Sequence, residues 1–182
     1  MYQCNLANVD PTEEAYVAAL KEFADANPDL PVIIGQSFQV KAFSDLGPTK
    51  EAIDSVISDR PVIVTDTSKH SYWANSAAIE MAGITEDTPD PDGGKIYRND
   101  DGGIRGYFAD VYMFNYILAL SSTTLEQYEA AWMKWQEEAN SFGITAFSSG
   151  GLIVENTLGK EDKWAMVERL RQEGTLTIRA NM

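Results

Sequence analysis

The chain has 182 residues, of which 28 are Asp or Glu and 14 are Lys or Arg, so its formal net charge is −14. This charge repels nucleic-acid phosphates and anionic lipids, and we therefore exclude nucleic acid and membrane as partners. The sequence has one His and one Cys, fewer than a self-contained zinc site needs, and one Cys cannot form an intrachain disulfide. With no apolar run of membrane-spanning length and no signal peptide, the composition is typical of a cytoplasmic domain.

The first part of the chain predicts alternating helices and strands. The residues Asp10–Glu13 combine a cap residue, a proline and a glutamate, and they begin a helix that ends near Asn27. The apolar runs 31–35 and 61–65 are typical of buried parallel strands, and Gly47-Pro48-Thr49 begins a helix between them. The order strand, helix, strand predicts a parallel sheet.

The middle of the chain predicts a helix over 73–81, closed by Gly83. Two apolar segments, 95–97 and 104–107, flank an acidic tip and predict a β-hairpin that projects from the sheet. The remaining residues predict helices at about 109–120, 123–141 and 162–172, and strands at 144–147 and 176–179. The capping box Thr123-x-x-Glu126 begins the helix 123–141, whose predicted core face consists of Leu125, Tyr128, Trp132, Trp135 and Ala139.

The segment 66–76 is the most informative for chemistry. It follows the carboxyl end of the strand that ends near Thr65, the edge of a parallel sheet where ligands bind. The only His of the chain, His70, lies there beside Lys, Ser, Tyr, Trp and Asn, which supply a titrating group, hydrogen-bond donors and a flat apolar wall. A lone His is also commonly structural, so both interpretations stay open. No G-x-S-x-G elbow is present, which disfavours a serine hydrolase.

The acidic run 87–93 does not match a calcium loop. When Gly93 is aligned with the loop's invariant glycine, Thr88 stands in place of the first Asp and Asn99 in place of the closing Glu. A proline-rich turn is the favoured interpretation, and cation binding by the acidic loops is a minor alternative.

Between residues 59 and 106 a series of motifs follows in a fixed order: Asp59-Arg-Pro-Val62, His70-Ser-x-Trp73-x-Asn75-Ser76-x-Ala78, Ala82-Gly-Ile-Thr85, Thr88-Pro-Asp-Pro-x-Gly-Gly94, Asp101-Gly102 and Gly106. This series resembles the YtcJ-like amidohydrolases, a branch of the metal-dependent amidohydrolase superfamily. The resemblance implies an α/β fold, namely a partial TIM-barrel-like parallel sheet with helices and an inserted β-hairpin. It further implies that residues 1–182 form a single α/β fragment, with a family-type insertion at about 86–108.

The resemblance also implies roles for residues near His70. His70 falls on the family's loop histidine and is expected to orient substrate or to shuttle a proton. Trp73 and Asn75 match the same motif and are expected to bind substrate, Trp73 as a wall of the pocket and Asn75 as a hydrogen-bonding group.

In three segments the sequence departs from the family pattern. Members commonly have Asp-Gly before the loop His, where this chain has Ser68 and Lys69, and we include Lys69 among the expected substrate-binding residues. Asp110 stands where members commonly have Glu, and we expect it to keep a catalytic role with a shorter reach. Ser149 replaces an acidic residue of a later strand.

The predicted function is the internal, substrate-pocket portion of an amidohydrolase that hydrolyses C–N bonds of an amide or cyclic amide. None of the family's metal-binding His motifs is present, so no metal ligand is predicted in this chain. A divalent metal, expected to be zinc, belongs to the full-length parent, and the isolated chain is expected to be inactive. The alternative is a non-catalytic module that binds a small ligand or another protein. A barrel fragment leaves strand edges and apolar faces uncovered, so we expect a homo-oligomer.

Overall fold

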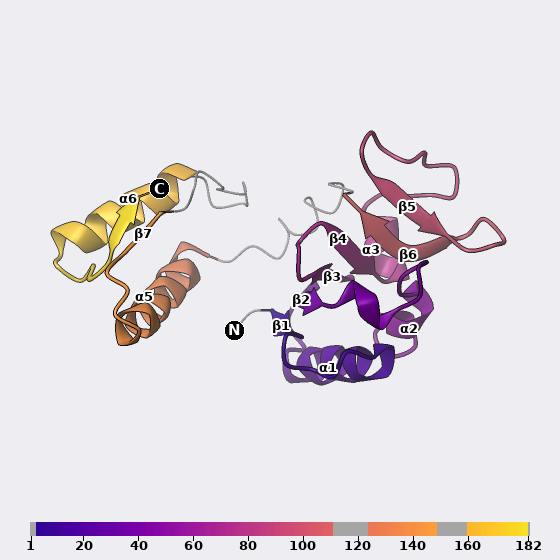
Figure 1. The fold of residues 1–182 in the computed structure, drawn as a ribbon, viewed down its shortest axis with the longest axis horizontal. Helices are drawn as coiled ribbons and strands as arrows, with labels where there is room; N and C mark the ends of the chain where they lie inside the picture. The colour runs from indigo at the N-terminus through magenta and orange to yellow at the C-terminus, as the bar shows by residue number, and fades with distance from the viewer. Residues whose placement is uncertain (1–2, 111–123, 149–159, 182) are drawn as a thin grey trace. The chain divides into compact units, whose positions relative to one another are not determined.

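The structure is a computed structural model that describes residues 3–110, 124–148 and 160–181 (Figure 1). The chain divides into two compact units, Met1–Ser121 and Ser122–Met182. The helix expected at about 109–120 lies outside the described residues apart from its first two positions, and Ser149 also lies outside them. The single α/β fragment over 1–182 stays a prediction.

The first unit is built on a six-stranded mixed sheet with the strand order β1-β2-β3-β4-β6-β5. Strands β1, β2 and β3 pair in parallel, whereas β4 pairs antiparallel with both β3 and β6, and β5 pairs antiparallel with β6. The bounds are β1 Cys4–Asn5, β2 Ile33–Phe38, β3 Val62–Asp66, β4 Ser71–Ala74, β5 Lys95–Arg98 and β6 Ile104–Ala109. The α/β class and a parallel part of the sheet are confirmed, and the barrel stays a prediction.

Helices pack on both faces of this sheet, and the inner strand β3 accordingly begins with three consecutive buried apolar residues, Val62–Val64. Helices α1 (Glu13–Ala26) and α2 (Lys50–Asp54) share one core with alternate strand residues. That core includes Tyr16, Leu20, Ile33, Ile53, Val62, Val64, Trp73 and Tyr107. Helix α3 (Ser76–Met81) covers the other face, with a core that includes Ile34, Ile63, Tyr72, Ile79, Ile96 and Phe108.

The helix predicted over 73–81 is wrong in its first part. Residues Ser71–Ala74 form β4, and α3 begins only at Ser76. All four residues of β4 are buried, so this short strand has no alternation of buried and exposed positions to distinguish it from a buried helical turn. Asn75 separates the two elements, because its backbone is extended and its side chain accepts a hydrogen bond from the N–H of Ala78 as an N-cap.

The predicted β-hairpin is present as β5 and β6, with Ile96 opposite Phe108 and Arg98 opposite Ile104. It extends the sheet instead of projecting from it, because β6 also pairs with β4. The guanidinium of Arg105 donates two hydrogen bonds to the carbonyl oxygen of Gly47, at 3.0 and 3.1 Å, which ties the hairpin to the loop before α2.

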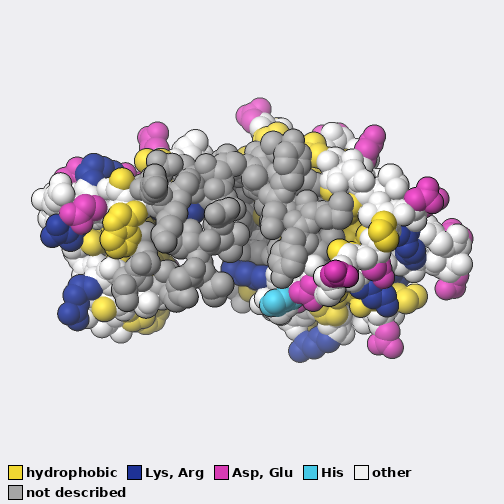
Figure 2. Space-filling model, turned by 90° about the horizontal axis from the view of Figure 1, so that it is seen from above, with side chains coloured by type: hydrophobic (Ala, Val, Ile, Leu, Met, Phe, Trp, Pro, Cys, Tyr) yellow, Lys and Arg dark blue, Asp and Glu magenta, His cyan; other side chains and the backbone are white. Residues whose placement is uncertain are grey.

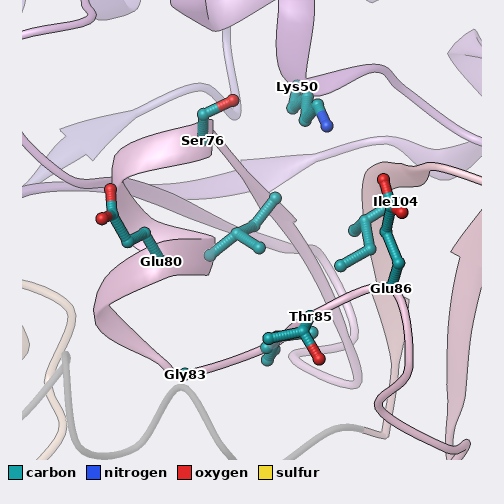
Figure 3. A pocket seen from close by; sticks show the side chains of 9 residues that line it. Lys50, Ser76, Glu80, Gly83, Thr85, Glu86 and Ile104 are labelled. Atoms are coloured by element: carbon teal, nitrogen blue, oxygen red, sulfur yellow. The ribbon is translucent and has the colours of Figure 1, made fainter.

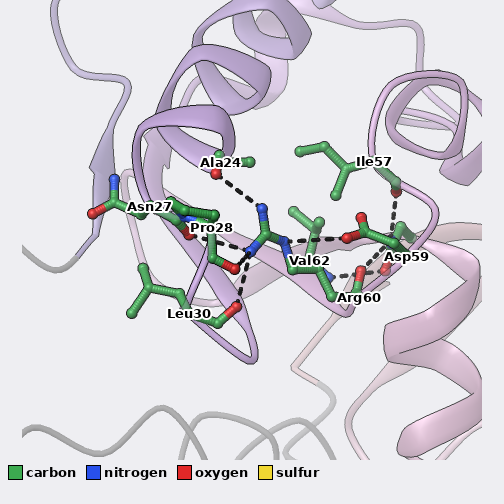
Figure 4. A network of polar contacts seen from close by, with 9 residues as sticks. Ala24, Asn27, Pro28, Leu30, Ile57, Asp59, Arg60 and Val62 are labelled. Atoms are coloured by element: carbon green, nitrogen blue, oxygen red, sulfur yellow. Dashed lines mark hydrogen bonds and ion pairs between the residues drawn. The ribbon is translucent and has the colours of Figure 1, made fainter.

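Arg60 joins the end of α1 to the beginning of β3 (Figure 4). Carbonyl groups at a helix C-terminus lack intrahelical partners, and a guanidinium satisfies several of them at once. Arg60 donates hydrogen bonds at 2.8–3.2 Å to the carbonyl oxygens of Ala24, Asn27, Pro28 and Leu30. The same side chain therefore fixes the entry of the strand whose far end carries the candidate site.

The second unit consists of α5 (Leu125–Ser141), β7 (Ala146–Ser148), α6 (Lys160–Gln172) and β8 (Arg179–Asn181). Strands β7 and β8 pair in parallel. The capping box lies one residue later than predicted, at Thr124 and Gln127. On the predicted core face Trp132 and Ala139 are buried, whereas Leu125 and Trp135 are 37% and 39% exposed. None of the described helices in either unit has the length and apolar character needed to cross a bilayer.

Candidate functional site

The turn between β3 and β4 is organised by the buried carboxylate of Asp66. Its Oδ1 accepts hydrogen bonds from the backbone N–H groups of His70 and Ser71, both at 3.1 Å, and its Oδ2 accepts one from the hydroxyl of Ser68 at 2.6 Å. Asp and Ser side chains commonly bind nearby backbone in this way and so favour turns. The turn is held in one conformation at the carboxyl end of a parallel strand.

Lys69 lies at the tip of this turn with a φ of 64°, in the left-handed region. Its backbone N–H donates to the carbonyl oxygen of Asp66 at 3.2 Å, and its side chain is exposed. A residue with a Cβ is strained in this conformation by about 1 kcal/mol, whereas glycine adopts it freely. The side chain of Lys69 adds a positive charge to the turn, on the residue next to His70 in the chain.

His70 and Asp110 meet at the surface, although they are 40 residues apart in the chain. The ring Nδ1 of His70 lies 2.7 Å from Oδ1 of Asp110, and the N–H of Asp110 donates to the carbonyl oxygen of His70 at 2.7 Å. The two side chains are 69% and 40% exposed, and Figure 2 shows the histidine at the surface beside acidic side chains. An ionised carboxylate only accepts hydrogen bonds, so in a neutral imidazole this contact selects the tautomer that carries its proton on Nδ1 and its lone pair on Nε2.

The side chains of Trp73 and Asn75 are fully buried, and their hydrogen-bond partners are backbone groups of the fold. The indole N–H of Trp73 donates to the carbonyl oxygen of Thr49 at 2.8 Å. Asn75 accepts from the N–H groups of Val62 and Ala78 and donates to the carbonyl oxygens of Ile57 and Arg60, all at 2.9–3.0 Å. These four bonds use the whole hydrogen-bonding capacity of the amide. The structure therefore brings His70 and Asp110 together, with Lys69 next to His70 in the turn, and it gives Trp73 and Asn75 contacts that stabilise the fold.

Two polar groups beneath the surface pair were missing from the sequence interpretation. One is Asp66; the signal for it was a carboxylate directly after an apolar strand, followed two residues later by serine. The other is the hydroxyl of Tyr107, which donates to Oγ of Ser71 at 3.2 Å. Burial raises the pKa of Tyr107, so the phenol stays protonated as the donor of this bond.

The described residues do not fit a metal ion. Among them, no group of three or more His, Cys, Asp or Glu side chains is placed to hold one. The only cysteine, Cys4, is buried, and burial raises the pKa of its thiol to about 11. A metal needs the thiolate, so this side chain is a poor ligand.

A separate pocket of about 370 Å³ opens at the opposite end of the sheet (Figure 3). Ser76 and Glu80 of α3 lie on one side of it, and Lys50 and Ile104 lie on the other. Ile104 begins β6, whereas Asp110 directly follows the end of that strand. The pocket therefore has no part in the His70–Asp110 pair.

Comparison with known proteins gives one family and several relatives. The model of the Amidohydrolase family matches residues 2–182. The exoenzymes regulatory protein AepA of Pectobacterium carotovorum subsp. carotovorum is 29% identical over 170 residues, which are 89% of this chain and 35% of that protein. The putative amidohydrolase YtcJ of Bacillus subtilis (strain 168) is 33% identical over 100 residues, which are 54% of this chain and 19% of the relative.

Two further matches concern a short segment and the fold. The N-substituted formamide deformylase of Arthrobacter pascens is 42% identical over 55 residues, which are 30% of this chain and 10% of that enzyme. The crystal structure of an uncharacterized metal-dependent hydrolase from Pyrococcus horikoshii OT3 matches 98% of this chain and 32% of its own, with a TM-score of 0.59 and 17% identity. The chain thus spans about a third or less of each of these proteins.

Proposed function

The chain belongs to the amidohydrolase family, as the motifs around His70 predict, and we propose that it forms the substrate-pocket part of a metal-dependent enzyme that hydrolyses C–N bonds. The proposed substrate is a small molecule with an amide or cyclic amide bond. N-substituted formamides are the first compounds to assay, because one relative is a deformylase of such compounds.

The observation that carries this proposal is the 2.7 Å contact between Nδ1 of His70 and the carboxylate of Asp110. Both residues follow the carboxyl ends of strands that run in the same direction, β3 and β6, with β4 antiparallel between them. In open α/β sheets that edge is where ligands bind. A carboxylate on Nδ1 fixes the orientation and the tautomer of a neutral imidazole, the arrangement of a general base.

Hydrolysis of an amide requires a water oxygen to attack the carbonyl carbon and a proton to reach the departing nitrogen. In the proposed mechanism Nε2 of His70 accepts the proton from water and returns it to the amine as the C–N bond breaks. Asp110 holds the ring in place and stabilises its charged form. Lys69 supplies a positive charge beside the reacting groups, where a carbonyl oxygen or a substrate carboxylate binds.

The family implies a divalent metal, which when bound polarises the carbonyl and lowers the pKa of water. The described residues do not fit such an ion, so no step above passes through one. We propose that the ligands belong to the remainder of a longer protein, with zinc as the metal, and that the 182-residue chain alone does not turn over substrate.

The second candidate function is a module that binds a small ligand or a protein without catalysis. It is favoured by the lack of a metal-holding group among the residues with described positions. Under this alternative His70 and Asp110 contribute to affinity for a ligand and not to a rate.

The test compares His70→Gln and Asp110→Asn in the full-length parent, assayed with N-substituted formamides and cyclic amides. We expect kcat to fall by about 10²–10⁴-fold for His70→Gln, the range of a lost general base, and by less for Asp110→Asn. Glu14→Gln, on the exposed face of α1, is the control and is expected to keep full activity. An unchanged kcat in His70→Gln contradicts the proposal, and a change confined to KM means that the pair binds substrate without taking part in the chemistry. A full-length parent that binds these compounds without turning them over favours the binding module.

A further inference from the structure

We propose that Asp66 is a positioning residue that holds His70 against Asp110, and this proposal rests on the function proposed above. No motif assigned Asp66 a role. The hydrogen bonds of its carboxylate go to backbone N–H groups and to the Ser68 hydroxyl and not to the ring of His70, so we expect it to act on the reaction through the backbone of the turn.

The first step is that both carboxylate oxygens of Asp66 are occupied by the turn that carries His70. The residue is 5% exposed, and its three donors come from Ser68, His70 and Ser71. Hydrogen bonds to a buried carboxylate are stronger than neutral ones, and a buried donor left without its acceptor is costly. Asp66 therefore fixes the backbone of the turn firmly.

The second step is that the peptide groups of His70 are bound on both sides. Its N–H donates to Asp66, and its carbonyl oxygen accepts from the N–H of Asp110. The next residue, Ser71, is already in the sheet, opposite Ala109. The position of the His70 Cα is thus set between a buried carboxylate and the end of β6, which brings Nδ1 within 2.7 Å of its partner.

The third step concerns how far the ring of His70 can move before the reaction slows. A proton-transfer group works only over hydrogen-bond distance, and a displacement of about 1 Å is enough to lower a rate by about 10²-fold. Loss of the Asp66 contacts frees the turn, which already contains the strained Lys69, to relax away from Asp110. The pair at the surface thus depends on the carboxylate below it.

The experiment uses the 182-residue chain and nuclear magnetic resonance. His70 is the only histidine, so its ring gives one set of signals without assignment by mutagenesis. The Asp110→Ala variant gives the reference positions of the His70 ring signals when the ring has lost its carboxylate partner. Asp66→Asn keeps the length of the side chain and an amide oxygen that accepts the two backbone bonds, whereas Asp66→Glu keeps the charge and displaces the acceptor by one methylene.

Positioning predicts that Asp66→Glu moves the His70 ring signals toward those of Asp110→Ala and that Asp66→Asn leaves them near the wild-type values. A long-range effect of charge predicts the reverse. Asp54→Ala is the matched control: Asp54 accepts from the N–H of Ser76 at 3.0 Å and from its hydroxyl at 2.6 Å, at the other end of the sheet. It is expected to lower stability without moving the ring signals.

The proposal is wrong if Asp66→Glu leaves the ring signals unchanged, or if Asp66→Asn moves them as far as Asp110→Ala does. These measurements need neither substrate nor metal, so their outcome is independent of the assay that tests the function. In the full-length parent we expect Asp66→Glu to lower kcat by about 10²-fold with little change in KM. The separate variant Asp66→Asn is expected to keep most of the wild-type kcat.

Discussion

Asp110 contacts His70 twice: its backbone N–H donates to the carbonyl oxygen of His70, and its carboxylate meets Nδ1 of the same residue, each at 2.7 Å. One contact fixes the peptide and the other fixes the ring. Because Asp110 itself has a φ of 51°, the chain turns sharply at the end of β6 to make both contacts. A single exposed polar contact contributes little to stability, so we interpret this geometry as one that orients the ring.

Lys69→Gly is expected to stabilise the chain by about 0.5–1 kcal/mol, because glycine removes the strain of the φ of 64°. The free energy of unfolding in urea measures the effect. Lys21→Gly, in the middle of α1, is the control and is expected to destabilise by about 1 kcal/mol. Equal losses in both variants contradict the assignment of strain to Lys69.

Gly47→Ala is expected to destabilise the first unit by about 2–4 kcal/mol. A Cβ at this position collides with the ring of Tyr107, and the φ of 74° adds strain. Gly102→Ala has the same kind of φ, at 88°, with no atom within 4 Å of the added Cβ. Its cost is therefore expected to be only the backbone term of about 1 kcal/mol, and a similar loss in both variants contradicts the steric argument.

Asn75→Ala is expected to destabilise the chain by about 3–5 kcal/mol, since it leaves buried N–H and carbonyl groups of four residues without partners. Asn140→Ala removes one exposed hydrogen bond to Thr177 and is expected to cost less than about 1 kcal/mol. Thermal and urea unfolding measure both. If Asn75 serves mainly to bind substrate, its loss leaves the free energy of unfolding almost unchanged.

Cys4 makes stability depend on pH in the alkaline range. Burial raises the pKa of its thiol from 9.0 to about 11, so the folded state favours the neutral form. That contribution to the free energy of unfolding is present in full below pH 9 and is lost as the pH rises through about 11. The loss is on the order of 1–3 kcal/mol. We expect the free energy of unfolding to decline less steeply with pH in Cys4→Ala than in the wild type over the same range. Parallel declines in the two proteins contradict a raised pKa of Cys4.

Self-association is expected because large apolar side chains are exposed on the second unit. Phe142 is 76% exposed and Trp164 is 48% exposed. Light scattering over a range of concentrations is expected to show a mass that rises above that of the monomer. The double substitution Phe142→Ser and Trp164→Ser is expected to reduce the rise, and a monomeric mass at every concentration contradicts the prediction.

Local patterns predicted much of the fold. The apolar runs before Thr65 and Gly35 gave strands that pair in parallel, because such runs are typical of strands covered on both faces. The same logic failed at Trp73, where four buried residues had no period to separate strand from helix. The place of β6 beside β4 was not predictable, since it depends on contacts between distant segments.

The candidate site was predicted in part, and the reason lies in what a motif can show. The position of His70 after a strand predicted that it faces the ligand-binding edge. Its partner Asp110 is 40 residues away, and the contact depends on a backbone turn that the residue type does not specify. Asn75 matched a family motif, and the match did not reveal the four hydrogen bonds that this side chain makes to the backbone; its role in binding substrate stays a prediction.

Arg60 has a consequence for the order of folding. Its bond to the carbonyl oxygen of Ala24 spans 36 residues, so it closes only after α1 and the strand entries have come together. The entropy of closing such a loop is lost before the bonds are gained. We therefore expect the hydrogen bonds of the guanidinium to form after the transition state for folding. Their removal is expected to speed unfolding and to leave the folding rate almost unchanged.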